Sequence, residues 1–243
     1  MPRIAAKSLF LVGLVIGLGR AASAGSLQIE PVLLDVTAPA ATSTVTLRNQ
    51  GATPINVQIR VFRWSLVDGQ EKLEPTEDVV ASPPSVTLTP NGQYIARIVR
   101  VSKQPVSGEE SYRLLVDQLP DLSQQKNGAV NLLVRYSIPV FFGAAEKKSP
   151  AVQWSAAIKG DKLILVARNT GERRLRISSL NVRDANGRSI SFGNGLAGYA
   201  LGQSTKSWVA PGSARGFVTN GPAAISAQSD GGPITATASV TGR

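Results

Sequence analysis

The chain has 243 residues with 26 lysines and arginines against 16 acids, a formal charge of +10, and neither cysteine nor histidine. Without histidine or cysteine, Ser-His-Asp and Cys-His catalysis and the usual zinc sites are excluded. The scattered acids show no calcium-loop spacing, and no spacing supports a hydrolase that uses serine with lysine or paired carboxylates. Basic residues do not interleave with aromatics on one face, which argues against nucleic acid as a partner. We therefore expect a protein that is not an enzyme, with no metal site and no cofactor.

The first residues are typical of a signal peptide. A positively charged start, a short apolar run at 9–18 and small residues at 22–24 predict removal of residues 1–24 on export. The alternative is an uncleaved N-terminal anchor. No later stretch approaches the roughly 20 apolar residues that a membrane span needs, so we expect no span after the signal is removed.

Almost every segment of the next hundred residues alternates apolar and polar positions as a β-strand does. Turn signals at 49–51, 68–69 and 90–92 separate these segments. Short strands with turns every 8 to 12 positions are typical of an immunoglobulin-like sandwich. The strands are expected at 27–30, 32–36, 45–47, 55–64, 86–88, 94–101 and 112–119.

The stretch 127–142 (NGAVNLLVRYSIPVFF) predicts one long strand after an Asn-Gly turn. Pro139 has no N–H donor, so a sheet tolerates it at an edge, a bulge or a strand end. A long apolar edge strand is normally an aggregation hazard. Its apolar face is expected to consist of Val130, Leu132, Val134, Tyr136, Ile138, Val140 and Phe142.

Small, charged and proline residues at 143–150 indicate a domain junction, so the expected domains are 25–143 and 144–243. Strands resume beyond it, the glycine-rich tract 192–202 is expected to be a loop, and no amphipathic helix of useful length is found. The predicted fold is all-β, with two immunoglobulin-like β-sandwich domains in series. The second-domain strands are expected at 152–158, 162–168, 175–183, 189–192, 205–209, 214–218 and 234–240.

Several motifs occur in an order that resembles the periplasmic pilus-assembly chaperones of the chaperone–usher pathway. They are Pro83-Pro84 followed by Leu88-Thr89-Pro90, then Leu119-Pro120, then Ile138-Pro139-Val140-Phe141. The extended form RYSIPVFF resembles the archaic, or Csu-like, branch. The resemblance covers the whole mature chain and implies a boomerang of two domains with a cleft between them.

The resemblance also implies a function. Such chaperones bind and fold pilin subunits in the periplasm, fill the subunit's open groove with one of their own strands, and deliver the subunit to an outer-membrane usher. By position, the donor residues are Val130, Leu132 and Val134. Whether the free protein masks this strand by self-association stays open.

Family members hold the subunit's C-terminal carboxylate with two basic residues in the cleft, and here the chain departs from the pattern. Pro31 and Pro139 stand at the positions of the well-known branch's anchors, and Gly143 replaces its interdomain ion-pair arginine. Arginine suits a buried carboxylate because its planar fork can bind both oxygens. The anchor candidates are Arg97 and Arg135, with Arg100 and Arg113 in reserve.

Two other interpretations stay open. Val130, Leu132 and Val134 also suit an ordinary core, which periodicity alone would favour. The competing function is an exported β-sandwich binding module, pilus subunit or adhesin. Pilins usually carry cysteines, and this chain has none.

Overall fold

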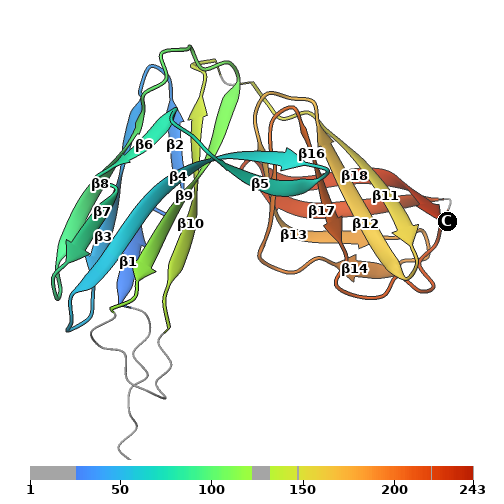
Figure 1. Cartoon of the computed structure of the whole chain (residues 1–243). Coiled ribbons are helices and arrows are strands. Elements are labelled where there is room, and N and C mark those ends of the chain that lie inside the picture. Colours follow the sequence, from blue (N-terminus) through green and yellow to red (C-terminus); the bar gives the residue numbers. More distant parts are fainter. Residues whose placement is uncertain (1–25, 122–131, 147, 220, 243) are drawn as a thin grey trace, which may run out of the picture.

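The computed structural model describes residues 26–121, 132–146, 148–219 and 221–242, and these form two β-sandwiches set at an angle (Figure 1). Strands β1 to β10 build the first sandwich. Their bounds are β1 Leu27–Glu30, β2 Leu34–Thr37, β3 Thr42–Asn49, β4 Ile55–Val67, β5 Gln70–Pro75, β6 Val79–Ser82, β7 Ser85–Leu88, β8 Gln93–Arg100, β9 Glu109–Leu119 and β10 Arg135–Gly143.

The first sandwich consists of two sheets. One has the order β1-β3-β8-β6; the other has the order β2-β10-β9-β4-β5, with β7 also paired to β4. Alternate apolar side chains of both sheets fill the space between them, among them Leu47, Ile59, Ile98 and Leu114, which are almost fully buried. The period of two in the sequence therefore becomes one buried and one outward face for each sheet.

The second sandwich contains the remaining strands in the order β14-β13-β17-β18-β11-β12-β16, with β15 paired to β13. Leu163, Leu165, Ile177 and Ile225 lie in its core. The bounds are β11 Val152–Lys159, β12 Lys162–Asn169, β13 Leu175–Arg183, β14 Ser189–Ser191, β15 Leu196–Ala200, β16 Ser204–Val209, β17 Pro222–Ser229 and β18 Gly232–Gly242.

Each sandwich contains the same buried asparagine corner. Asn49 ends β3 and Asn169 ends β12, and each side chain donates to three backbone carbonyls through Nδ2. Each Oδ1 accepts the N–H of the glycine two residues on, Gly51 or Gly171. A buried amide with its partners satisfied fixes the path of the following loop, so the two domains use one device to turn the chain.

The all-β, two-sandwich fold that the sequence predicts is confirmed, with local corrections. No strand forms at 214–218, and β15 lies within the glycine-rich tract expected to be a loop. Strands β5, β6 and β17 were not predicted. All six residues of β5 are exposed, so the apolar alternation that signals a half-buried strand is absent there.

The long strand expected over 127–142 is shorter in the described part. β10 begins at Arg135, and residues 132–134 precede it without strand structure. Its alternation is as expected, because Ile138, Val140 and Phe142 are buried in the first core and Tyr136 packs against it.

A long hairpin links the two domains. β4 and β5 project from the first sandwich to β16 of the second (Figure 1). Its turn, Asp68-Gly69, has positive φ at both residues (52° and 78°), the conformation that two-residue hairpin turns require. At the tip, the Ser207 N–H donates to the Gly69 carbonyl at 3.1 Å.

Candidate functional site: the free edge of β10 and the interdomain cleft

The edge of β10 is only partly paired. Toward β9 it is paired throughout, from Arg135–Asp117 to Gly143–Glu109. Toward β2 it is paired only from Val140 to Gly143. In the described part of the chain, the edge of residues 135–139 that faces away from β9 therefore has no neighbouring strand and can accept one.

The residues that lead into this edge are apolar and exposed. Leu132 has 84% of its surface exposed and Leu133 has 49%. Val134 is half-buried, and its carbonyl accepts the Gln118 N–H at 3.0 Å. The third expected donor residue, Val130, lies outside the described residues. Exposed leucines beside an unpaired strand edge form a surface that an apolar groove would cover.

The structure places the two leading anchor candidates far apart. Arg97 is exposed between the buried residues Ala96 and Ile98, so it lies on the outer face of the β1-β3-β8-β6 sheet. Arg135 lies on the outer face of the other sheet and binds Asp117. These faces are on opposite sides of the sandwich, so the structure does not bring the two guanidinium groups together.

Arg135 belongs to a small cluster at the far end of the free edge. The Asp117 carboxylate binds both Arg135 and Arg60, the latter at 2.7 Å. Burial on its own raises the pKa of Asp117, but hydrogen bonds from the two arginines outweigh this and leave the pKa lowered. A pocket of about 370 Å3 beside this cluster is lined by Leu133 and Val134 among others.

Arg100, a reserve candidate, points into the first sandwich. Its guanidinium makes two hydrogen bonds of 2.8 Å to Glu110, and its side chain is buried. The Tyr112 hydroxyl also donates to Glu110, and Arg63 joins Tyr112 to Asp78. This network joins the two sheets, and the Arg100 guanidinium is already bound inside the first sandwich.

Arg113, the other reserve candidate, lies at the domain junction. Its guanidinium carbon is 3.7 Å from the centre of the Trp64 ring, and Nη2 is 3.1 Å from Glu71 Oε2. In the β9–β10 ladder Arg113 stands directly opposite Pro139, the position that the family resemblance matched to an anchor. Only 12% of its side chain is exposed, so the cation is built into the wall of the junction.

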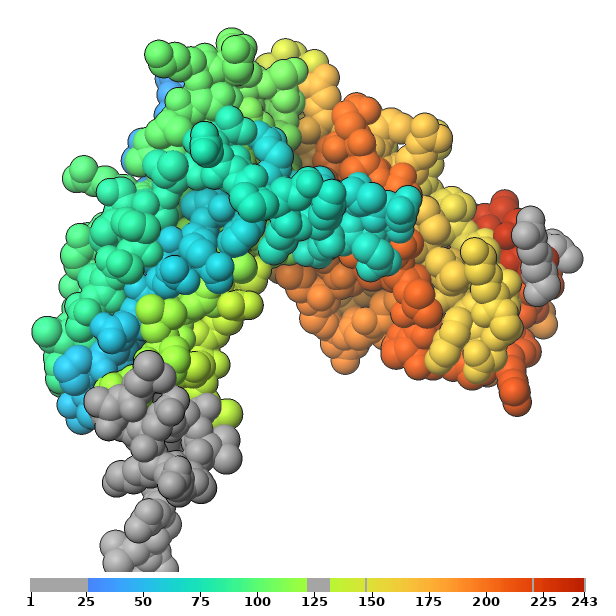
Figure 2. Space-filling model, in the orientation of Figure 1, coloured from blue at the N-terminus to red at the C-terminus, as the bar shows by residue number. Residues whose placement is uncertain are grey.

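An aromatic cluster and ion pairs join the domains. Trp64 and Phe141 of the first domain pack on Tyr199 and Leu201 of the second. Figure 2 shows the two domains enclosing an open concave side, with β10 (lime) along it. The cleft is therefore closed at the aromatic cluster and open toward the start of β10.

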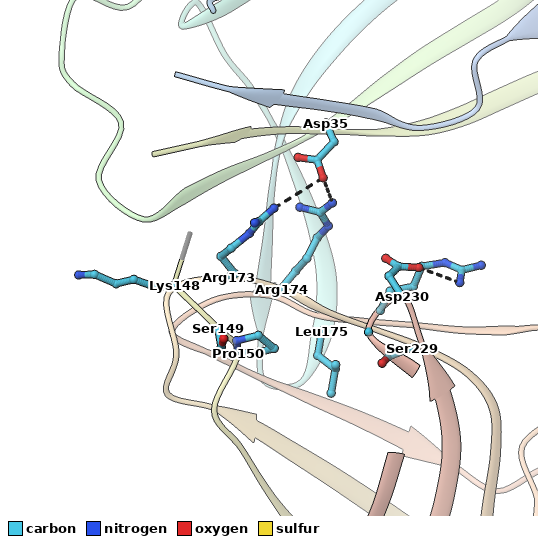
Figure 3. A pocket seen from close by; sticks show the side chains of 11 residues that line it. Asp35, Lys148, Ser149, Pro150, Arg173, Arg174, Leu175, Ser229 and Asp230 are labelled. Carbon is cyan, nitrogen blue, oxygen red and sulfur yellow. Dashed lines mark hydrogen bonds and ion pairs between the residues drawn. The ribbon is translucent and has the colours of Figure 1, made fainter. Parts of the chain in front are cut away.

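Interdomain ion pairs form near Gly143, although that position carries no arginine. Arg174, which directly precedes β13, binds Asp35 at 2.6 Å (Figure 3). It also binds the Glu109 side chain, which is buried and belongs to the ladder partner of Gly143. Arg173 supports both acids at 3.6 and 3.4 Å. The interdomain ion pair that Gly143 put in doubt is thus formed by arginines of the second domain, a change that sequence matching at one position does not reveal.

The described residues show neither a metal-ligand cluster nor a helix long and apolar enough to cross a membrane. What they do offer is an extended strand edge that ends in a cleft with buried cations. Chemically, this arrangement suits an extended polypeptide segment that ends in a carboxylate.

Comparison with known proteins defines the class. Residues 26–145 match the family described as pili and flagellar-assembly chaperone, PapD N-terminal domain. No curated protein sequence matches significantly.

Solved structures of chaperones share the fold. The chain resembles a structure of the CsuC–CsuE chaperone–tip adhesion subunit pre-assembly complex, from archaic Csu pili of Acinetobacter baumannii, with 24% identity, TM-score 0.66 and coverage of 90% and 100% of the two chains. It resembles the YadV chaperone with 18% identity, TM-score 0.61 and coverage of 87% and 98%. It resembles the Salmonella enterica SafA pilin–SafB chaperone complex with 20% identity, TM-score 0.60 and coverage of 89% and 98%.

The chain belongs to the pilus-assembly chaperone family of the chaperone–usher pathway. The family is one of chaperones and not of enzymes, and the two-domain fold and the role in pilus assembly expected from the sequence are confirmed.

Proposed function

We propose that this protein captures a pilin subunit by adding its own β10 edge, and the residues before it, to the subunit's incomplete sandwich. The observation that carries this proposal is the half-paired β10, whose free edge continues into the exposed Leu132. Strand addition gives affinity through main-chain hydrogen bonds, which depend little on sequence. One such edge would therefore serve several subunits.

Val130, Leu132 and Val134 are the proposed donor side chains. Burying each in an apolar groove contributes about 1.5–3 kcal/mol before ordering costs. Leu132 is already displayed to solvent, so its burial in a subunit would remove apolar surface from water without unpacking the chaperone's own core.

Among the four candidate arginines, we propose Arg113 as the anchor of the subunit's carboxylate. It lies at the closed end of the cleft, opposite Pro139, so a segment anchored there can run along residues 139–135 and onward past 134. Anchoring at Arg135 would leave most of the edge uncovered, Arg97 lies on the wrong face, and Arg100 is held by Glu110. Arg135 is then placed to contact the middle of the docked segment.

We further propose that the protein works in the periplasm, after removal of residues 1–24, and hands its subunits to an outer-membrane usher. The support is the leader-like start and the family, whose solved relatives include chaperone–subunit complexes. The domains proposed are 25–143, which provides the strand edge, and 144–243, which forms the other wall of the cleft.

The test is co-expression with a pilin subunit, followed by co-purification. The wild type should bring the subunit into a soluble complex, and Leu132→Asp should lose most of it, because a carboxylate cannot enter an apolar groove without a large desolvation cost. Since Leu132 lies outside the core, the variant should keep its melting temperature.

Leu196→Asp, another exposed leucine on β15 of the second domain, is the matched control and should capture normally. Soluble subunit without the chaperone would contradict the capping function. Equal capture by Leu132→Asp and wild type would remove the donor assignment.

A further inference from the structure

Glu71 occupies an unusual place in the cleft. It lies on β5, the edge strand of its sheet, and its two carboxylate oxygens face two cations from different domains. Oε2 is 3.1 Å from Arg113 Nη2 of β9, and Oε1 is 4.0 Å from Lys206 Nζ of β16. This is the arrangement that a pair of cations would give to a terminal carboxylate.

The cations are fixed in the walls of the cleft, whereas the acid is not. The side chains of Arg113 and Lys206 are 12% and 10% exposed, but that of Glu71 is 37% exposed. Arg113 is further held against the Trp64 ring. A rotation of the Glu71 side chain toward water would free both cations without unfolding any strand.

A carboxylate at this position solves a physical problem of the free protein. Two largely buried cations without a partner are costly, because desolvation is not compensated. A captured subunit would supply its own carboxylate, but the protein has to fold before a subunit arrives. An internal acid that the subunit's carboxylate can displace gives the cations a partner in the free protein and makes them available when a subunit is captured.

We propose that Glu71 is an internal stand-in for the subunit's C-terminal carboxylate, and that Lys206 is the second cation of that site. The assignment rests on the proposed carboxylate anchoring at Arg113, and it gives the site one cation from each domain. Capture exchanges one carboxylate for another, so the cations never lose their partner.

The experiment measures binding of an N-acetylated heptapeptide that alternates valine and serine, made with a free C-terminal carboxylate or with a C-terminal amide. Titration is followed by calorimetry and by the Arg113 Nε–H resonance. The wild type should prefer the carboxylate form, and Arg113→Gln should abolish the preference.

Glu71→Gln should bind the carboxylate peptide about two- to five-fold more tightly, since the competing charge is gone. Lys206→Gln should bind it about ten-fold more weakly or worse, as expected for loss of a charge-assisted contact. Neither change should alter binding of the amide peptide by more than about a factor of two.

Glu74→Gln, on the same strand but paired to the exposed Lys72, and Lys159→Gln are the controls and should match the wild type. Unchanged or weaker carboxylate binding by Glu71→Gln would overturn the stand-in role and leave an ordinary interdomain brace. If Lys206→Gln binds the carboxylate peptide as tightly as the wild type does, Lys206 is not the second cation of the site, and the assignment of Arg113 is unaffected. If the wild type binds the carboxylate and amide peptides equally, the proposed anchoring at Arg113 is overturned as well.

Discussion

At the scale of single residues, the protein uses arginine in two distinct ways. Arg100 and Arg63 stabilise the first sandwich through Glu110, Tyr112 and Asp78. Arg113 instead faces the cleft, where its partner Glu71 is half-exposed. Because both kinds are charged residues in predicted strands, the sequence alone does not show which of them faces the cleft.

Glu110 provides a stability test with a defined pH dependence. Burial alone raises its pKa, but hydrogen bonds from Arg100 and Tyr112 outweigh this and lower the pKa below its usual value. The ionised form therefore stabilises the fold above the unfolded-state pKa of about 4.3, and this contribution is lost as the pH falls through the lower folded-state pKa. Glu110→Gln should cost about 3 kcal/mol at pH 7, because Arg100 remains buried without its partner.

The measurement is urea unfolding at pH 7, 5 and 3. The difference in unfolding free energy between Glu110→Gln and wild type should narrow toward pH 3, because the unfolded chain takes up a proton at Glu110 below about pH 4.3 and this removes part of the wild type's advantage. Glu74→Gln, which removes an exposed pair with Lys72, should cost less than about 1 kcal/mol at every pH. A Glu110→Gln difference that stays constant with pH would contradict the assigned role of the carboxylate.

At the scale of elements, the working parts are a strand and a hairpin. β10 is fixed to β9 along its length and to β2 only at its end, which leaves its first half open. The β4–β5 hairpin reaches across the junction and carries both the Gly69 contact and Glu71. The position of the hairpin tip thus sets where Glu71 meets its cations.

Gly69→Ala tests the hairpin. Gly69 has φ of +78°, and an added Cβ would lie 2.3 Å from Ser207 Oγ, so the tip must move away from β16. We expect a cost of about 1 kcal/mol for the left-handed backbone alone, with more for the clash. Hydrogen exchange of the Ser207 amide should accelerate, because its acceptor is the Gly69 carbonyl.

Gly187→Ala is the matched control, since Gly187 has φ of +85° in the turn between β13 and β14, with no atom within 4 Å of an added Cβ. It should carry the backbone cost without faster exchange at Ser207. Unchanged exchange in Gly69→Ala would show that the hairpin does not brace the second domain.

At the scale of the whole molecule, the angle between the domains depends on a small junction. The aromatic cluster supplies the apolar contact, and Arg174 joins Asp35 and Glu109 while its guanidinium lies 3.7 Å from the centre of the Phe141 ring. Interdomain contacts of this modest kind permit motion unless specific bonds oppose it. Here buried ion pairs oppose it.

Arg174→Gln should loosen that junction. Glu109 has only 1% of its side chain exposed, and although the Arg174 backbone N–H and Arg173 remain, the loss should cost about 3 kcal/mol. Small-angle scattering should show a broader distribution of interdomain distances. Arg176→Gln, which removes a more exposed pair with Asp230, should change neither quantity by more than the error. Similar effects of both variants would contradict the role of Arg174 in holding the junction.

The sequence by itself determined most of the strands, the two-sandwich fold and the resemblance, because alternation of apolar residues and turn chemistry are local properties. Because Arg97 and Arg100 are three positions apart in one predicted strand, the sequence also places them on opposite faces of that strand, as the structure shows for β8. It could not show which face meets the cleft, because that depends on the order of strands within each sheet. Only the tertiary structure decided that β10 stays half-unpaired and that Arg113, Glu71 and Lys206, from three strands and two domains, meet at one point. Such meetings depend on long-range packing, to which no local pattern in the chain corresponds.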